Sequence, residues 1–264
     1  MRNLANEFDV SIRTPAEIRQ AAVRLREAVE TLGPFQIIPC DDIACPAPMR
    51  DAEGRILAEE VFGWADRSDW YKHKNLALED PISEACRYES EPFYMVDGRF
   101  ITLHANEFLS SIDASSQDRW LGSNPASGIV VPVHMAMGTI GALGLYVFAT
   151  GFDVAAVFQH YADDLFIMGH RFINGYRKVT QRSRQLSASG PHLTKHEVQC
   201  LKWAAFGKTD EEIALIIKRS TSTVRFHLNK AAVKLNTSNR PQTVVKATQL
   251  GYIGQYPVRS KQSG

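Results

Sequence analysis

An arginine, an asparagine and a phenylalanine stand together on one side of the helix that residues 220–235 would form. At about 100° per residue, the positions that share this side are Ser222, Arg225, Phe226 and Asn229. Arginine can form two hydrogen bonds with guanine, asparagine can form two with adenine, and a phenyl ring can contact a thymine methyl group. These residue types predict a helix that reads bases in the major groove of double-stranded DNA.

A polar flank and an apolar stripe complete this helix. The flank carries hydroxyl, imidazole and ammonium groups that can contact phosphates, at Thr223, His227, Lys230 and Lys234. The stripe lies opposite the base-reading side and would pack on neighbouring helices; it comprises Val224, Leu228, Ala231 and Leu235. The alternative interpretation is a surface helix whose basic face contacts only water.

Two capping boxes place further helices just before this one. They pair Thr194 with Glu197 and Thr209 with Glu212, and Ser220 marks a third helix start. In a capping box the hydroxyl accepts a first-turn N–H, and the carboxylate accepts the N–H of the capping residue. Three starts with such short connections predict a helix-turn-helix unit.

The charge of the chain is divided between its two ends. Residues 192–264 carry 12 Lys and Arg against 4 Asp and Glu, a net charge of +8. The 18 basic and 25 acidic residues before them give −7. A basic end attached to an acidic front indicates a nucleic-acid module joined to a domain with another task.

The C-terminal segment resembles the LuxR-type helix-turn-helix over nearly its whole length. The resemblance is carried by Leu193-Thr194 with Glu197, Gly207-Lys208-Thr209, Thr223-Val224, Lys234-Leu235-Asn236, and the run from Asn236 to Arg240 that leads into Pro241. Glu197, Leu201 and Gly207 match positions that define the fold in that family. The resemblance implies control of transcription, with the last helix, 241–250, helping to pair two DNA-binding domains.

The front half alternates helical and strand patterns. A helix is expected from Thr14 to about residue 32, a strand at 35–40 and a second strand at 55–61. Residues 127–149 predict an antiparallel hairpin, in which Pro132 indicates a local edge or a bulge. An amphipathic helix of about 25 residues should follow from Asp153; its length suggests that part of its apolar stripe, Val157 to Tyr176, packs on a partner subunit.

These elements predict an α+β protein with two domains. Residues 1–178 should form an α-β-α sandwich sensor domain with an antiparallel sheet and a pocket between its layers. Residues 179–192 read as a linker, and residues 193–264 as an all-α helix-turn-helix domain. The aromatic residues Trp64, Trp70, Tyr71, Tyr88 and Tyr94 either line the pocket or are ordinary core and surface side chains.

The front half is also similar to the autoinducer-binding domain of the LuxR family. The matching residues are Tyr71, Asp80-Pro81, Pro92-Phe93, the run 128–134 and Gly141-Ala142-Leu143. The resemblance implies that Asp80 accepts the amide N–H of an acyl-homoserine lactone and that Tyr71 bonds the acyl carbonyl. A buried carboxylate needs such a donor, since burial without one is costly.

Three positions depart from the family pattern. Arg67 stands where a tryptophan usually meets the lactone carbonyl, with Trp70 nearby but out of register; Met95 replaces a second tryptophan, and Gly144 replaces a serine or threonine of some members. The expected signal is therefore an acyl-homoserine lactone or a related small amphipathic molecule. A regulator without a ligand, or with a non-lactone effector, is the alternative.

Other classes of protein find less support. Asp41-Asp42 and Asp80 superficially suggest the acidic pocket of a response regulator's phosphoacceptor domain, but a helix precedes the first strand. No nucleophile elbow, phosphate loop or metal-ligand cluster points to an enzyme, a metal site or a cofactor.

The four cysteines, Cys40, Cys45, Cys86 and Cys200, are expected to be reduced structural thiols. The alternative is that Cys40 and Cys45 form a redox pair. Without a signal peptide or an apolar span, we expect a cytoplasmic homodimer on an inverted repeat and no membrane contact.

Overall fold

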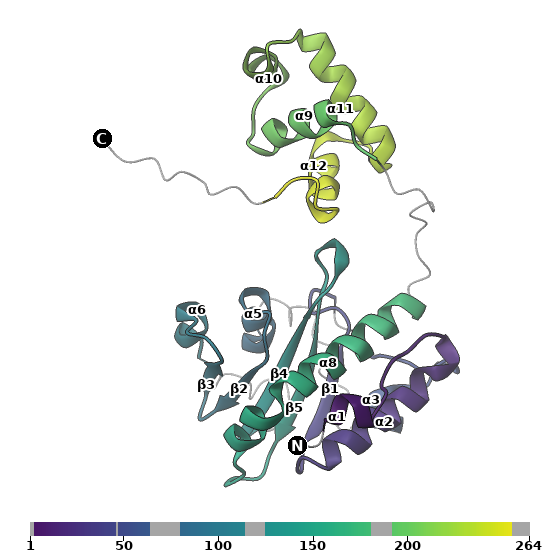
Figure 1. Cartoon of the computed structure of the whole chain (residues 1–264), viewed down its shortest axis with the longest axis vertical. Coiled ribbons are helices and arrows are strands. Elements are labelled where there is room, and N and C mark those ends of the chain that lie inside the picture. The colour runs from purple at the N-terminus through teal and green to yellow at the C-terminus, as the bar shows by residue number, and fades with distance from the viewer. Residues whose placement is uncertain (1–2, 46, 64–79, 114–124, 181–191, 255–264) are drawn as a thin grey trace. The chain divides into compact units, whose positions relative to one another are not determined.

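The computed structural model describes residues 3–45, 47–63, 80–113, 125–180 and 192–254. These residues form two compact units, the first within residues 1–135 and 139–182, the second within residues 183–264 (Figure 1). The first unit is built around a sheet, and the second consists of helices. The α+β class with a separate helical unit is confirmed.

An antiparallel sheet forms the centre of the first unit. In the described residues its strands are β1 (Gln36–Cys40), β2 (Phe93–Val96), β3 (Arg99–Thr102), β4 (Ser127–His134) and β5 (Ile140–Val147), in the spatial order β1-β5-β4-β2-β3. Every neighbouring pair is antiparallel. The predicted hairpin is β4–β5. Pro132 lies beyond Val130, the last residue that β2 pairs, so the missing N–H falls at a local edge.

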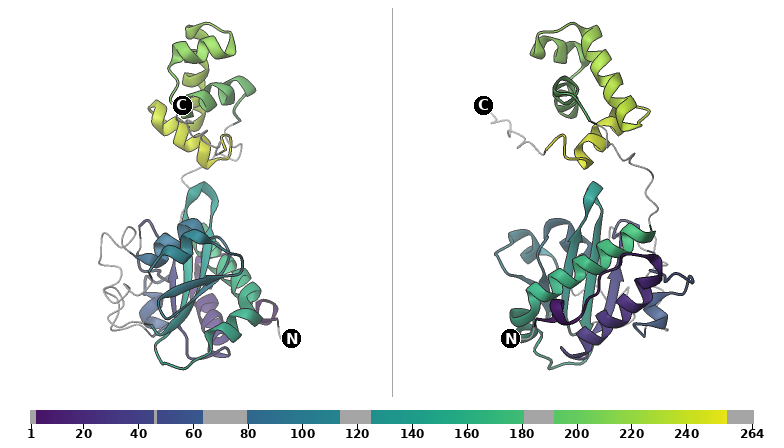
Figure 2. Two further views of the ribbon diagram at one scale, coloured as in Figure 1. Left: turned by 90° about the vertical axis from the view of Figure 1, so that its left-hand side faces the viewer. Right: turned by 45° about the vertical axis from the view of Figure 1, so that its right-hand side comes forward.

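Two helices cover one face of this sheet (Figure 2). α2 (Ile18–Glu30) follows the 3₁₀ turn η1 (Pro15–Glu17), whose capping box joins Thr14 and Glu17. α8 (Val154–Thr180) lies so close to the sheet that a Cβ at Gly169 would come 2.9 Å from Cγ1 of Val131. The short helix α1 (Leu4–Glu7) packs on α8.

The apolar stripe of α8 is used within its own unit. Phe158, Leu165, Met168, Phe172 and Tyr176 are all buried in the single core of the sheet unit. Val157 and Tyr161 are half-buried against the same core. Most of the stripe thus packs on the sheet, as the apolar face of a sheet requires. The expectation that part of it packs on a partner subunit stays a prediction, for which Val157 and Tyr161 retain exposed surface.

The second predicted strand, at 55–61, is also wrong. Residues Leu57–Glu60 form the short helix α3, preceded by a single bridge between Arg50 and Ile56. The buried residues there are Leu57, Ala58, Val61 and Phe62. This i, i+1, i+4, i+5 pattern is the inner side of a helical turn, whereas a strand would have turned Leu57 and Ala58 to opposite faces.

The other face of the sheet is covered by α5 (Pro81–Tyr88), with α6 (Glu107–Ser111) packed beside it and against β3. α5 begins at Asp80, whose side chain caps it, and has proline in its first turn. Its far end is held by His134, whose Nε2 lies 2.9 Å from the carbonyl oxygen of Cys86 and 3.1 Å from that of Glu89. The first unit is thus the expected α-β-α sandwich.

The second unit contains α9 (Lys195–Ala205), α10 (Asp210–Ile217), α11 (Thr221–Leu235) and α12 (Arg240–Gln249). Both predicted capping boxes are present: the backbone N–H of Thr194 donates to Glu197 at 2.7 Å, and that of Thr209 donates to Glu212 at 2.8 Å. The N–H of Thr223 donates to the hydroxyl of Ser220 at 3.2 Å. The local start signals therefore gave the correct helices.

A buried ion pair fixes α9 against α11. Glu197 is 4% exposed, and the ammonium of Lys234 donates to its carboxylate at 2.8 Å. Burial alone would raise the pKa of Glu197, but the bonds from Lys234 and from the N–H of Thr194 outweigh it, and the pKa is lowered. Leu201, Ala231 and Leu235 pack beside this pair.

Lys234→Met should lower the free energy of unfolding of the helical unit by about 2–3 kcal/mol at pH 7, because it leaves the Glu197 charge buried without its cation. Lys230→Met, on the exposed side of the same helix, is the control and should change little. Urea unfolding of the whole chain, followed by circular dichroism, measures both. Equal effects of the two substitutions would mean that the ion pair contributes nothing specific. Since the folded pKa of Glu197 is lowered, the wild-type advantage should disappear as the pH falls through that value.

Candidate functional site

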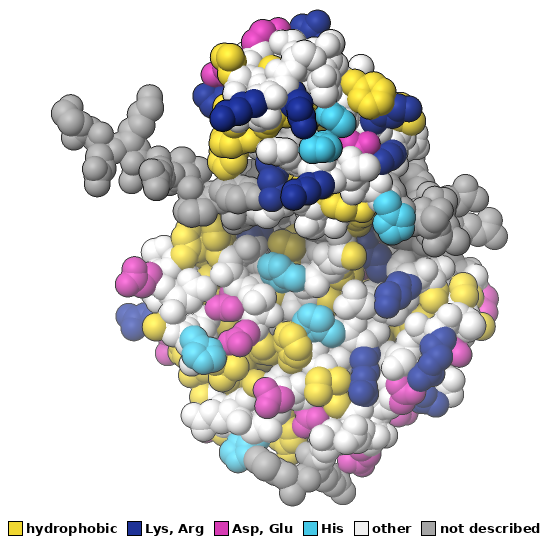
Figure 3. All heavy atoms as spheres, turned by 45° about the horizontal axis from the view of Figure 1, so that its top comes forward, with side chains coloured by type: hydrophobic (Ala, Val, Ile, Leu, Met, Phe, Trp, Pro, Cys, Tyr) yellow, Lys and Arg dark blue, Asp and Glu magenta, His cyan; other side chains and the backbone are white. Residues whose placement is uncertain are grey.

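The exposed side of α11 is the side that the helical wheel assigned to base reading. Ser222, Arg225, Phe226 and Asn229 are exposed, whereas Val224, Ala231 and Leu235 are buried. Lys and Arg side chains gather on the visible face of the helical unit in Figure 3. Phe226 is 56% exposed, so its ring is available to contact DNA bases. An exposed helix with these donors and this ring has the composition of a recognition helix.

The flank predicted to meet phosphates is divided in the structure. Lys230 is exposed, with its ammonium 5.7 Å from the centre of the Phe226 ring. Thr223 and His227 are half-buried, and the ring of His227 stacks on that of His196 at 5.4 Å between ring centres. Lys234 is held by Glu197 and has a role in the fold. The structure describes all four predicted flank residues. Of the two lysines among them, Lys230 is the one whose ammonium is left to contact phosphates.

Arg225 has partners that the sequence did not indicate. Its Nε donates to Asp210 at 3.2 Å and its Nη2 donates to Glu211 at 3.3 Å. Asp210 also accepts a 2.6 Å bond from Nη1 of Arg240, at the start of α12. Asp210 thus lies between two arginines from two other helices. A carboxylate behind an arginine orients the guanidinium while leaving other N–H groups for a base.

Asp80 is the centre of the second candidate site, in the first unit. It is 5% exposed, and its Oδ2 accepts the N–H of Ser83 at 2.9 Å and the Ser83 hydroxyl at 2.7 Å. Among the described residues, its Oδ1 accepts the N–H of Ile82 alone, at 3.3 Å. Burial raises the pKa of Asp80 in spite of these bonds. Oδ1 therefore retains capacity for one more donor.

Met95 and Gly144 lie on the face of the sheet that α5 covers. Strand residues alternate between faces, and Met95 pairs with Gly128, which pairs in turn with Tyr146. Gly144 lies two residues from Tyr146 and shares its face. The charge of Asp80 adds to burial in raising the pKa of Tyr146 and of the Cys40 and Cys86 thiols. The structure brings Asp80, Met95 and Gly144 to one layer.

The other predicted ligand residues do not join this group. Arg67, Trp70 and Tyr71, together with Trp64, lie outside the described residues. Tyr88 is 58% exposed, and Tyr94 stacks on Phe158 of α8, on the opposite face of the sheet. Of the two alternatives for these aromatic residues, Tyr88 and Tyr94 fit the second, a surface and a core side chain, because β2 turns Tyr94 to the face opposite Met95.

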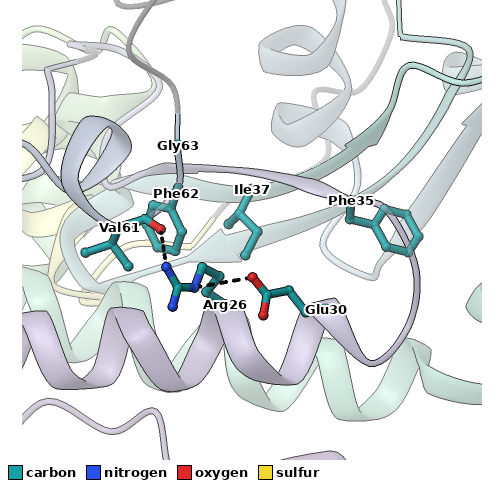
Figure 4. A pocket seen from close by; sticks show the side chains of 7 residues that line it. All are labelled: Arg26, Glu30, Phe35, Ile37, Val61, Phe62 and Gly63. Carbon is teal, nitrogen blue, oxygen red and sulfur yellow. Dashed lines mark hydrogen bonds and ion pairs between the residues drawn. The ribbon is translucent and has the colours of Figure 1, made fainter.

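A cavity of about 240 Å³ lies on that opposite side, next to β1 (Figure 4). Arg26 and Glu30 of α2 line it with Ile37 and Phe62, and Arg26 donates to the carbonyl oxygen of Val61 at 3.2 Å. Ile37 pairs with Leu145, so it points away from the face that carries Gly144. This cavity and Asp80 are consequently separated by the sheet.

The structure excludes the response-regulator alternative. A phosphoacceptor domain of that kind is built on a parallel sheet, whereas every strand pair here is antiparallel. Asp41 and Asp42 both bind Arg177, at 3.1 and 3.3 Å. All four cysteines are free thiols, so Cys40 and Cys45 form no disulfide. Among the described residues no group of acidic, His and Cys side chains could hold a metal ion, and no helix has the length and apolarity of a membrane span.

Comparison with known proteins decides the family. Residues 191–247 match the GerE family, described as bacterial regulatory proteins of the luxR family. The transcriptional activator protein LuxR of Aliivibrio fischeri is 33% identical over 215 residues, which cover 80% of each chain. The chain belongs to the LuxR family. It is a DNA-binding transcriptional regulator of the LuxR type, as its α11 residues and the resemblance had indicated.

Other relatives and solved structures are similar over different shares of the chain. VjbR of Brucella abortus, a quorum sensing-dependent transcriptional regulator, is 52% identical over 61 residues, 23% of this chain and 24% of that one. A crystal structure of Escherichia coli SdiA covers 71% of this chain and 73% of that one at 20% identity, with a TM-score of 0.42. SdiA in complex with octanoyl-rac-glycerol covers 96% and 95% at 18% identity, with a TM-score of 0.44.

Base contacts and phosphate contacts should respond differently to substitution. We expect Arg225→Ala and Asn229→Ala each to weaken binding to a duplex selected from a random pool by about 1–3 kcal/mol and to relax base preference at one step of each half-site. Lys230→Ala should weaken all duplexes alike and lower the slope of log affinity against log salt by about one. Fluorescence anisotropy across salt concentrations measures this. If both classes of variant behave identically, the assignment of the α11 face is wrong.

Burial of Asp80 should make the stability of the first unit depend on pH. The pKa of Asp80 is raised in the folded protein, because burial disfavours the charged form. The contribution of Asp80 to the free energy of unfolding should therefore be highest at low pH, and it should fall as the pH rises above 3.8, the ordinary pKa of an aspartate. Asp80→Asn keeps a capping oxygen and cannot ionise. The free energy of unfolding, measured with urea, should therefore rise for Asp80→Asn relative to wild type as the pH is raised from 4 to 8. A constant difference across that range would contradict the assignment of a buried, destabilised charge.

Proposed function

We propose that this LuxR-family regulator reads an inverted-repeat promoter site with α11 and is controlled by a small amphipathic signal bound in its first unit. In this proposal residues 1–178 form the signal-binding domain, 179–192 the linker and 193–264 the DNA-binding domain. The base readers are Ser222, Arg225, Phe226 and Asn229. Thr223, His227 and Lys230 lie toward the phosphates, whereas Lys234, the fourth predicted contact, pairs with Glu197. The protein acts in the cytoplasm by binding, and no catalysis is part of the proposal.

The observation that carries signal binding is the state of the Asp80 carboxylate. It is 5% exposed, and burial raises its pKa although the charge of Arg87 acts the other way. Among the described residues, Oδ1 accepts one bond, the 3.3 Å bond from the N–H of Ile82, whereas Oδ2 accepts two from Ser83. A ligand amide N–H would supply the missing donor at low cost. The relatives' names support the class of signal, since VjbR is named as quorum sensing-dependent.

The head group of the signal follows from the departures in the sequence. Arg67 offers several N–H donors and a fixed positive charge where the family's tryptophan usually meets the lactone. This favours an acyl-homoserine lactone or an acyl amide whose head group is rich in carbonyl groups or anionic. Trp70, Tyr71, Met95 and Gly144 complete the proposed ligand contacts. A non-lactone effector is the second candidate, and Arg67 is the feature that favours it.

Calorimetric titration with N-octanoyl-homoserine lactone and with an N-octanoyl amide lacking the ring tests this proposal. We expect Asp80→Ala to weaken binding of either by about 10- to 100-fold, because the amide loses a charged acceptor. Asp163→Ala, an exposed acid on α8, is the matched control and should bind as wild type does. Arg67→Trp should shift preference toward the lactone.

Failure of the wild type to bind any member of this panel would leave the regulator without an amide signal. Binding that survives unchanged in Asp80→Ala would move the site elsewhere.

A homodimer is part of the proposal because one recognition helix reads only a few base pairs. The exposed apolar side chain of Val245 on α12, 55% exposed, supports pairing through that helix. Light scattering at micromolar concentration should give twice the mass of one chain on a DNA site of about two helical turns. Val245→Glu should reduce that mass to one chain. A monomer in wild type, both free and on DNA, would contradict the dimer.

A further inference from the structure

The ring of Tyr146 lies flat across two glycines of neighbouring strands. A Cβ at Gly144 would come 2.4 Å from its Cε2 and 2.8 Å from its hydroxyl oxygen, and a Cβ at Gly128 would come 2.8 Å from its Cδ1. Neither glycine has a positive φ, so the backbone does not require glycine at these positions. The space that the phenol occupies does require it.

The hydroxyl of Tyr146 makes no hydrogen bond to the residues that the structure describes. The residue is 5% exposed, and within the parts of the chain that the structure describes its hydroxyl has no hydrogen-bond partner. A hydroxyl on a largely buried residue gains free energy when a ligand supplies a hydrogen-bond partner. Burial first, and then the charge of Asp80, raise the pKa of Tyr146 well above its ordinary value, so the group remains an O–H donor.

Tyr146 and Asp80 offer complementary groups in one layer of the fold. α5, which Asp80 caps, packs on β4 and β5, and Tyr146 lies on β5 with its ring over the Gly144 side. Asp80 has room to accept one N–H, and Tyr146 has one O–H to donate. A secondary amide carries a matching donor and acceptor on adjacent atoms.

We propose that the Tyr146 hydroxyl donates to the carbonyl oxygen of an acyl amide whose N–H is accepted by Asp80, and that Gly144 and Gly128 are required to seat the Tyr146 ring. This inference rests on the proposed signal binding and adds to it a ligand contact from β5. Some members of the family have a serine or threonine at the position of Gly144. In this chain the hydroxyl of Tyr146 would take the place of that missing side-chain hydroxyl. The ligand class is a secondary amide with an apolar chain.

Tyr146→Phe removes the hydroxyl and keeps the ring on its glycines. Its affinity for N-octanoyl-homoserine lactone or the N-octanoyl amide should fall by about 3- to 10-fold, with an unchanged melting temperature. Tyr94→Phe, on the opposite face of the sheet, is the matched control and should bind as wild type does. Equal affinity of Tyr146→Phe and wild type would overturn the proposal, since only water would then meet the hydroxyl.

A second variant tests the seat of the ring. Gly144→Ala should displace the phenol and lower the affinity more than Tyr146→Phe does, because the added Cβ meets the ring at 2.4 Å. Gly144→Ser with Tyr146→Val should restore part of the affinity by placing a hydroxyl on residue 144. Gly144→Ala binding as tightly as wild type would overturn the seating role. If Asp80→Ala abolishes binding while every Tyr146 and Gly144 variant binds normally, this inference fails and the proposed function stands; no binding by wild type refutes both.

Discussion

A buried carboxylate must find hydrogen-bond donors, and each unit of this protein depends on how one carboxylate does so. Glu197 receives the ammonium of Lys234 and the N–H of Thr194, and its pKa is lowered. Among the described residues, Asp80 accepts hydrogen bonds from the first turn of its own helix, and burial raises its pKa although the charge of Arg87 acts the other way. The first carboxylate is satisfied by the fold, whereas we propose that the second offers an acceptor to the signal.

This difference connects the architecture to regulation. The Glu197 pair fixes α11 against α9, which buries the stripe around Ala231 and leaves Arg225 and Asn229 exposed for DNA. Asp80 fixes the start of α5 over the face of the sheet that carries Tyr146. A rigid helical reader and an incompletely satisfied sensor are the two parts that a signal-dependent regulator needs, and allosteric control consists of a coupling free energy between them.

The sequence predicted those features that depend on neighbouring residues. Both capping boxes, the β4–β5 hairpin and α8 follow from local patterns, and all are present. The strand at 55–61 was wrong because burial in the finished fold, rather than local pattern, selects α3. The bond of Arg225 to Asp210 and the seat of Tyr146 on Gly128 depend on residues that only the tertiary fold brings together. The sequence signal for this seat was the presence of Gly128 and Gly144 in the two strands of the hairpin that carries Tyr146. The positions of these glycines in the sequence do not show that the tyrosine ring lies over them.

If Asp80 binds the signal and α11 reads DNA, as we propose, the two sites should be energetically coupled. The most direct test is the affinity of the whole protein for a selected duplex, measured by fluorescence anisotropy with and without saturating N-octanoyl-homoserine lactone or the N-octanoyl amide. We predict a change of about fivefold or more in the DNA dissociation constant of wild type, as coupling free energies of 1–3 kcal/mol require, and no change for Asp80→Ala. An equal response of Asp80→Ala and wild type, or a ligand that binds wild type without changing its DNA affinity, would contradict the account.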